Sequence, residues 1–134
     1  MRSTPSNKSI LLIEDQASVQ ELVKTCLSGL AGWNIVVVSS AQAGLRCVAG
    51  KHPDVILLDF LTPGMDAKTF MHKLHSDPLT ASIPVILLSA RARWFTPLQL
   101  QQLGVVAAIA KPFNPMTLPD KIADALGWSW QTEI

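Results

Sequence analysis

The sequence has few cysteines and lacks an excess of either charge. Its two cysteines, Cys26 and Cys47, show no CxxC or other metal-binding spacing. We interpret them as buried free thiols, which fit a reducing compartment. Eleven basic and ten acidic residues give a formal net charge of +1. This balance argues against a nucleic-acid-binding protein and against a basic membrane-binding patch.

Long hydrophobic runs are also missing. No run approaches the roughly 18 residues that a membrane-spanning helix requires. The first residues, MRSTPSNK, are polar and lack the apolar core of a secretion signal. We therefore expect a cytoplasmic protein with a disordered arm over residues 1–8, one domain over residues 9–127 and a tail over residues 128–134. A chain of 134 residues is long enough to bury a core without disulfides.

Five short aliphatic runs recur along the chain. They are continuous rather than alternating, which is typical of parallel strands covered on both faces. The runs are SILLI (9–13), NIVVV (34–38), DVILL (54–58), PVILL (84–88) and VVAAIA (105–110).

Helical patterns fill the gaps between these runs. Ser40 is a predicted N-cap, Thr96 followed by Pro97 starts another helix, and Gly104 and Gly127 end helices. One face of the first helix is predicted from apolar residues at helical spacing, namely Val19, Leu22, Val23, Cys26, Leu27 and Leu30.

Five strands alternating with five helices predict a three-layer α/β fold. Right-handed crossovers favour the flavodoxin-like (βα)5 arrangement, with a parallel sheet of order 2-1-3-4-5. In that order the topological switch point lies between the first and third strands. Ligands are expected there, outside the carboxyl ends of the strands.

Polar residues end four of the five predicted strands. Glu14 and Asp15 follow the first strand, Asp59 the third, Ser89 the fourth and Lys111 the fifth. Three carboxylates about 5 Å apart repel one another by roughly 3 kcal/mol per pair at an effective dielectric constant near 20. Such a cluster favours a cation, and oxygen ligands suit Mg²⁺. An aspartate beside a metal and a lysine can also act as a nucleophile toward phosphate.

These residues carry a family resemblance that covers nearly the whole chain, from about residue 9 to residue 127. The acidic pair Glu14-Asp15, Asp59 in LLDFLTPGMD, Ser89 in LLSA and Lys111 in AKPF occur in this order. In this the chain resembles the receiver domains of two-component response regulators, of the single-domain, chemotaxis-regulator-like type. The resemblance implies a signalling domain that catalyses only its own phosphorylation and dephosphorylation, rather than an enzyme acting on other substrates.

The resemblance also implies a role for each residue of the motif. Asp59 would accept a phosphoryl group from a sensor histidine kinase or a phosphotransfer protein. Asp15 and Asp59 would bind Mg²⁺ directly, together with the backbone carbonyl of Leu61, and Glu14 would hold a metal-bound water. Ser89 and Lys111 would bind phosphoryl oxygens. The peptide bond between Lys111 and Pro112 would be cis.

The sequence departs from the family pattern where the signal would leave the site. The family usually places a tyrosine or phenylalanine three residues before the lysine, as a switch, but this chain has Ala108. Trp94 and Phe95 lie between the fourth strand and the fourth helix. We predict that they and Ala108 mark a partner face, with Arg91 and Arg93 as a basic rim.

The resemblance implies that a downstream protein effector binds the face formed by the fourth helix, fifth strand and fifth helix, or that a homodimer forms there. Two alternatives to the phosphorylated receiver exist. One is a receiver-like interaction scaffold that works without phosphorylation. The other is a hydrolase that uses an aspartyl-phosphate, but such enzymes need a second acid where this chain has Leu61.

Overall fold

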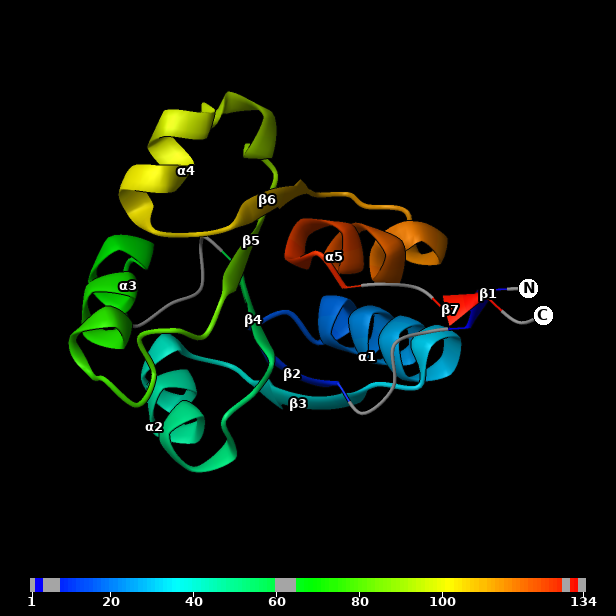
Figure 1. Cartoon of the computed structure of the whole chain (residues 1–134), viewed down its shortest axis with the longest axis horizontal. Helices are drawn as coiled ribbons and strands as arrows, with labels where there is room; N and C mark the ends of the chain where they lie inside the picture. The colour runs from blue at the N-terminus through cyan, green and yellow to red at the C-terminus, as the bar shows by residue number, and fades with distance from the viewer. Residues whose placement is uncertain (1, 4–7, 60–64, 129–130, 133–134) are drawn as a thin grey trace.

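The computed structural model of the chain describes residues 2–3, 8–59, 65–128 and 131–132. Its central sheet has five parallel strands in the order β3-β2-β4-β5-β6, which is 2-1-3-4-5 when these strands alone are counted. The predicted topology is therefore confirmed (Figure 1). The strands are β2 (Ser9–Ile13), β3 (Asn34–Val38), β4 (Val55–Asp59), β5 (Val85–Ser89) and β6 (Ala107–Ala110).

Helices cover both faces of this sheet. In Figure 1, α1 and α5 lie on one side of the strands, and α2 and α3 lie on the other. Two single-turn 3₁₀ helices, η1 and η2, precede α4 and α5. The bounds are α1 (Ala17–Ala31), α2 (Ala41–Lys51), α3 (Ala67–Ser76), η1 (Ala92–Trp94), α4 (Pro97–Leu103), η2 (Pro115–Thr117) and α5 (Leu118–Leu126).

The core forms two layers because successive side chains of a strand point to opposite faces of the sheet. Leu12 and Leu57 belong to the apolar cluster under α1 and α5. Leu11 and Ile56 belong to the cluster under α2 and α3. Both faces need apolar residues, and this explains why the strands read as continuous aliphatic runs.

The predicted helix caps are confirmed. The Ser40 hydroxyl accepts a hydrogen bond from the Ala43 backbone N–H, and Thr96 forms a capping box with Gln99. Gly104 and Gly127 take left-handed conformations at the ends of α4 and α5. The sequence pattern therefore located these helix ends correctly.

The predicted apolar face of α1 was partly wrong. Leu22 and Leu30 are 42% and 46% exposed, whereas Val23 and Leu27 are fully buried. The buried stripe is centred on Val23 and Leu27, and Ala31 extends it. Leu22 and Leu30 lie at the edge of this stripe, because a single layer of sheet covers only part of a helix surface.

The predicted start of the last strand was also wrong by two residues. Val105 donates its backbone N–H to the Leu100 carbonyl, so it belongs to the cap that ends α4. Val106 bonds to the Val85 carbonyl, and the strand β6 begins at Ala107. Gly104, at φ +86°, allows the chain to turn between helix and strand.

A second, two-stranded sheet joins segments near the start and the end of the chain (Figure 1). The short strands β1 (Arg2–Ser3) and β7 (Gln131–Thr132) pair antiparallel. They lie within the segments predicted as a disordered arm and a tail, and those domain boundaries stay predictions. Among the described residues, no helix is long and apolar enough to cross a bilayer.

Candidate functional site

The parallel sheet brings the predicted site residues to one edge. β4 lies between β2 and β5, and β6 pairs with the other side of β5. Asp59 and Ser89 are the last residues of β4 and β5, while Glu14 and Lys111 directly follow β2 and β6. The side chains of Glu14, Asp59 and Lys111 therefore meet at this edge, and Ser89 ends the strand beside β4.

Three carboxylates form the centre of this site. Glu14, Asp15 and Asp59 each offer one oxygen, and these oxygens lie within 4.8 Å of one another. Glu14 and Asp59 are buried, whereas Asp15 is exposed. Burying two neighbouring carboxylates is costly unless a cation or a proton compensates their charge.

Lys111 supplies part of that compensation. Its Nζ lies 2.6 Å from Oε1 of Glu14 and 3.4 Å from Oδ1 of Asp59. The other carboxylate oxygen of Glu14, Oε2, accepts the backbone N–H groups of Asp15 and Gln16 at 3.1 and 3.4 Å. One ammonium group thus serves two buried carboxylates, and the cluster keeps an excess of negative charge.

The environment of Glu14 shifts its protonation. Burial raises the pKa of the Glu14 carboxyl, and a side-chain hydrogen bond with Asp59 raises this pKa further. The Lys111 ammonium acts in the opposite direction but does not cancel these effects. A raised pKa is the expected response of a buried acid that lies beside a second acid.

Ser89 is buried at the end of β5, the strand beside β4. Its Oγ accepts the backbone N–H of Arg91 at 3.0 Å, so the hydroxyl hydrogen can be donated to an anion. The backbone N–H of Lys111 donates to the Ser89 carbonyl, which ties the two residues together. The peptide bond between Lys111 and Pro112 is cis, as expected.

Of the remaining predicted residues, the structure describes the side chains of only some. Leu61 and the side chain of Trp94 lie outside what the structure describes. Phe95 and Ala108 are both half-buried and pack against the same apolar cluster, the one under α2 and α3. They line different cavities, however, so the predicted partner face is not a single hollow.

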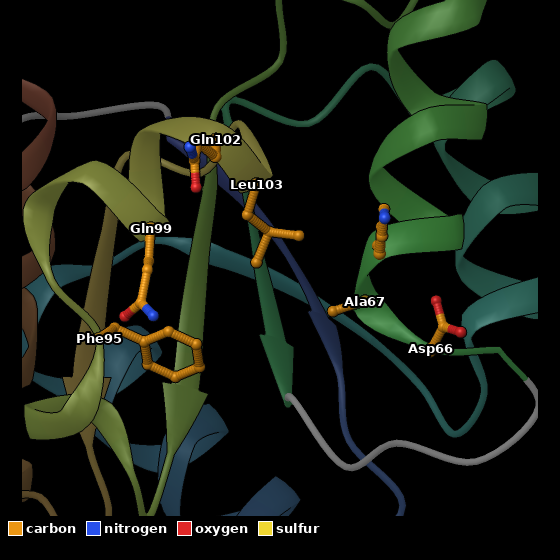
Figure 2. A pocket seen from close by; sticks show the side chains of 7 residues that line it. Asp66, Ala67, Phe95, Gln99, Gln102 and Leu103 are labelled. Atoms are coloured by element: carbon orange, nitrogen blue, oxygen red, sulfur yellow. The ribbon is translucent and has the colours of Figure 1, made fainter.

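The cavity beside Phe95 lies between the start of α3 and the η1–α4 segment, and has a volume of about 410 Å³. Figure 2 shows Leu103 of α4 and Ala67 of α3 on its opposite walls, with the Phe95 ring below Gln99. The cavity beside Ala108 measures about 510 Å³ and lies between η1, β6 and α5. Both cavities are lined in part by the segment that follows β5, the strand that ends at Ser89.

One residue at the site was not predicted from the sequence. Gln20, in the first turn of α1, donates its side-chain amide to the backbone carbonyl of Glu14 at 2.5 Å. The same amide lies 3.4 Å from the Ser39 hydroxyl. A single glutamine on a helix gives no signal in the sequence, because its role depends on a backbone acceptor from another element.

The donor set fits a hard divalent cation. All three clustered side chains offer carboxylate oxygen, and among the described residues this is the one acidic, histidine or cysteine cluster with such spacing. Oxygen ligands in small number suit Mg²⁺, which keeps several waters. The uncompensated negative charge favours a cation at this position.

Comparison with known proteins agrees with this arrangement. The family model described as the response regulator receiver domain matches residues 10–123. The phosphate regulon transcriptional regulatory protein PhoB of Pseudomonas aeruginosa is 30% identical over 119 residues, which are 89% of this chain and 52% of that protein. The chain spans about half the length of the curated relatives it matches.

Solved structures show the same fold. A response regulator from Desulfuromonas acetoxidans is 32% identical, with a TM-score of 0.77, and the match covers 90% of this chain and 97% of that one. The receiver domain of the sensor histidine kinase PA1611 from Pseudomonas aeruginosa is 24% identical, with a TM-score of 0.79 and coverage of 91% and 99%. That structure contains a magnesium ion coordinated in its active-site cleft.

Proposed function

Because the chain belongs to the family of response regulator receiver domains, we propose that it accepts a phosphoryl group on Asp59 and signals through protein–protein contacts. Receiver domains are signalling domains of two-component systems. The observation that carries the proposal is the Asp59 carboxylate, buried at the end of β4, 3.4 Å from the Lys111 ammonium and clustered with two further carboxylates.

In the proposed reaction, Asp59 is the nucleophile. A carboxylate oxygen of Asp59 forms a bond to phosphorus while the bond from phosphorus to the donor, a histidine nitrogen of a kinase or phosphotransfer protein, breaks. Lys111 offsets the charge of the transferred group, and the Ser89 hydroxyl donates a hydrogen bond to it. Catalysis thus consists of positioning and charge compensation, and the domain modifies only itself.

We assign the Mg²⁺ site to the same cluster. Asp15 and Asp59 would hold the ion directly, with the backbone carbonyl of Leu61, and Glu14 would act through a water. Bound there, Mg²⁺ would supply the positive charge that the transferred phosphoryl group requires. Glu14 suits an indirect role because its two carboxylate oxygens already accept bonds from Lys111 and from backbone N–H groups.

The proposed partners are a histidine kinase or phosphotransfer protein as donor and a protein effector as receiver of the signal. The proposed effector or dimer face is formed by α4, β6 and α5. Exposed Leu98 on α4 and Val106 before β6 support it, together with the cavity beside Ala108. The free cysteines Cys26 and Cys47 are consistent with a cytoplasmic location.

A second candidate is a receiver-like scaffold that works without phosphorylation. It is favoured by one observation, the small side chain of Ala108 where the family usually has an aromatic switch. With no ring to move, the usual coupling between the site and the outer face is missing at this position. The scaffold keeps the fold and its binding face but makes no use of Asp59.

A phosphoryl mimic distinguishes the two candidates. We expect Mg²⁺ with beryllofluoride to shift the backbone amide resonances of two groups of residues in the wild-type chain. One group surrounds Asp59, Ser89 and Lys111, and the other lines the cavity beside Ala108. An Asp59→Asn variant provides the control and should show none of these shifts. Wild-type shifts confined to the residues around Asp59 would support the scaffold. A wild-type spectrum that the mimic leaves unchanged, as it does that of the Asp59→Asn variant, would contradict the proposed function.

A further inference from the structure

The backbone carbonyl of Glu14 lies where two neighbouring strands separate. The Glu14 N–H still bonds to the Val38 carbonyl at the end of β3, at 3.0 Å. Beyond Val38 the chain leaves the sheet, because Ser40 caps α2. The next acceptor along β2, the Glu14 carbonyl, therefore needs a partner from outside the sheet, since buried backbone groups are rarely left unpaired.

Gln20 provides that partner. Its side-chain N–H₂ donates to the Glu14 carbonyl at 2.5 Å, and its own backbone N–H bonds to the Gln16 carbonyl in the first turn of α1. The amide also contacts the Ser39 hydroxyl at 3.4 Å. The half-buried Gln20 side chain thus connects the end of β2, the start of α1 and the segment after β3.

This contact fixes the backbone that carries Asp15. No hydrogen bond of the described residues holds the exposed Asp15 carboxylate itself, so its position depends on the backbone of residues 14–16. The Glu14 carboxylate holds that backbone on one side, through the N–H groups of Asp15 and Gln16. Gln20 holds it on the other side, through the Glu14 carbonyl.

From this geometry we propose that Gln20 is a positioning residue for the cation site, acting on Asp15 and Glu14 through the backbone between them. The inference rests on the proposed Mg²⁺ site. Mg²⁺ demands nearly ideal octahedral geometry, whereas Ca²⁺ accepts irregular oxygen ligands. Losing the Gln20 contact should therefore weaken Mg²⁺ binding more than Ca²⁺ binding.

The test compares Gln20→Met with the wild-type chain by calorimetric titration with MgCl₂ and, separately, CaCl₂. Methionine keeps the length of the side chain and removes its amide. We expect about tenfold weaker Mg²⁺ binding, the low end of what loss of an outer hydrogen-bond partner costs a metal site. The Ca²⁺ affinity should fall much less. A purely structural role would lower both affinities together, through the folded fraction, and leave their ratio unchanged.

Two further variants make the result specific. Gln20→Lys restores a donor; its extra positive charge weakens both cations alike, so the Mg²⁺/Ca²⁺ ratio should return toward the wild-type value. Ser39→Ala removes only the long 3.4 Å contact and should leave the ratio unchanged. An unchanged ratio in Gln20→Met would overturn the role of Gln20 alone, while absence of Mg²⁺ binding in the wild-type chain would overturn the proposed metal site as well.

Discussion

At the scale of single residues, the contact between Glu14 and Lys111 distinguishes this site. The Glu14 side chain has one methylene more than an aspartate, and its Oε1 lies closer to the lysine than Oδ1 of Asp59 does, at 2.6 against 3.4 Å. Lys111 is therefore held mainly by Glu14. The sequence predicts that these residues meet, but not which carboxylate holds the lysine, because that depends on side-chain reach within the folded site.

Replacing Lys111 should destabilise the protein. We expect Lys111→Met to lower the free energy of unfolding by about 3 kcal/mol at pH 8 in EDTA, because two buried carboxylates lose their cation. Mg²⁺ should restore part of the loss. Urea unfolding measures both effects, and Lys121→Met, at an exposed lysine of α5, is the matched control. Equal losses in the two variants would argue against a buried charge cluster.

A second prediction at this scale concerns Cys26, which is buried and donates its thiol to the Pro115 carbonyl. Burial raises the pKa of this thiol above its usual value near 9. The folded protein then keeps the thiol proton more tightly than the unfolded chain does. The contribution to stability is therefore complete below pH 9 and is lost as the pH rises through the folded-state pKa.

Cys26→Ala should remove this part of the pH dependence. The measurement is the urea midpoint of the variant and of the wild-type chain between pH 7.5 and pH 10.5. We expect the wild-type midpoint to fall more steeply above pH 9 than that of the variant. Parallel curves for the wild-type chain and the variant would refute the effect.

At the scale of elements, strands and caps were predictable and side-chain contacts between helices were not. Aliphatic runs and residues such as Ser40 and Gly104 report local conformation directly. The width of the buried stripe on α1 depends on what packs against it, so the exposure of Leu22 was not visible in the pattern. Val105 was assigned to a strand because it begins an aliphatic run, although the cap of α4 uses its backbone N–H.

The junction between α4 and β6 gives a prediction at this scale. Gly104 has φ +86°, and a Cβ added there would lie 2.5 Å from Cε1 of His75 on α3. Gly104→Ala should therefore destabilise the protein by more than 1 kcal/mol, of which about 1 kcal/mol comes from the left-handed backbone alone. Thermal or urea unfolding provides the measurement.

Two further variants separate the causes. His75→Ala combined with Gly104→Ala should recover the steric part of the loss and leave the backbone part. Gly29→Ala, in the last turn of α1 with no atom within 4 Å of the added Cβ, should instead stabilise the protein, by at most about 1 kcal/mol. A Gly104→Ala variant as stable as the wild-type chain would show that the junction is not constrained in this way.

At the scale of the whole molecule, a signal from the site has to reach the outer face formed by α4, β6 and α5. Ala108 pairs with Leu87 in the sheet and lines a cavity of about 510 Å³. This space should accept a ring, so we expect Ala108→Tyr to fold with a loss of about 1 kcal/mol, the low end of the cost of adding volume to a packed site.

The same variant reports on coupling, since the sequence contains no other tyrosine. If the site moves the segment that follows Ser89, Mg²⁺ with beryllofluoride should shift the ring proton resonances of Ala108→Tyr. Adding Asp59→Asn to the variant should abolish the shift. Ring proton shifts that stay unchanged when the mimic is added would indicate that the site is not coupled to this face.

The central claim, that Asp59 accepts a phosphoryl group, is tested most directly by intact-protein mass spectrometry after incubation with acetyl phosphate and Mg²⁺. We predict a mass gain of one phosphoryl group in the wild-type chain, and none when Mg²⁺ is replaced by EDTA or Asp59 by asparagine. An unmodified wild-type chain, or an equal gain in the Asp59→Asn variant, would contradict the claim.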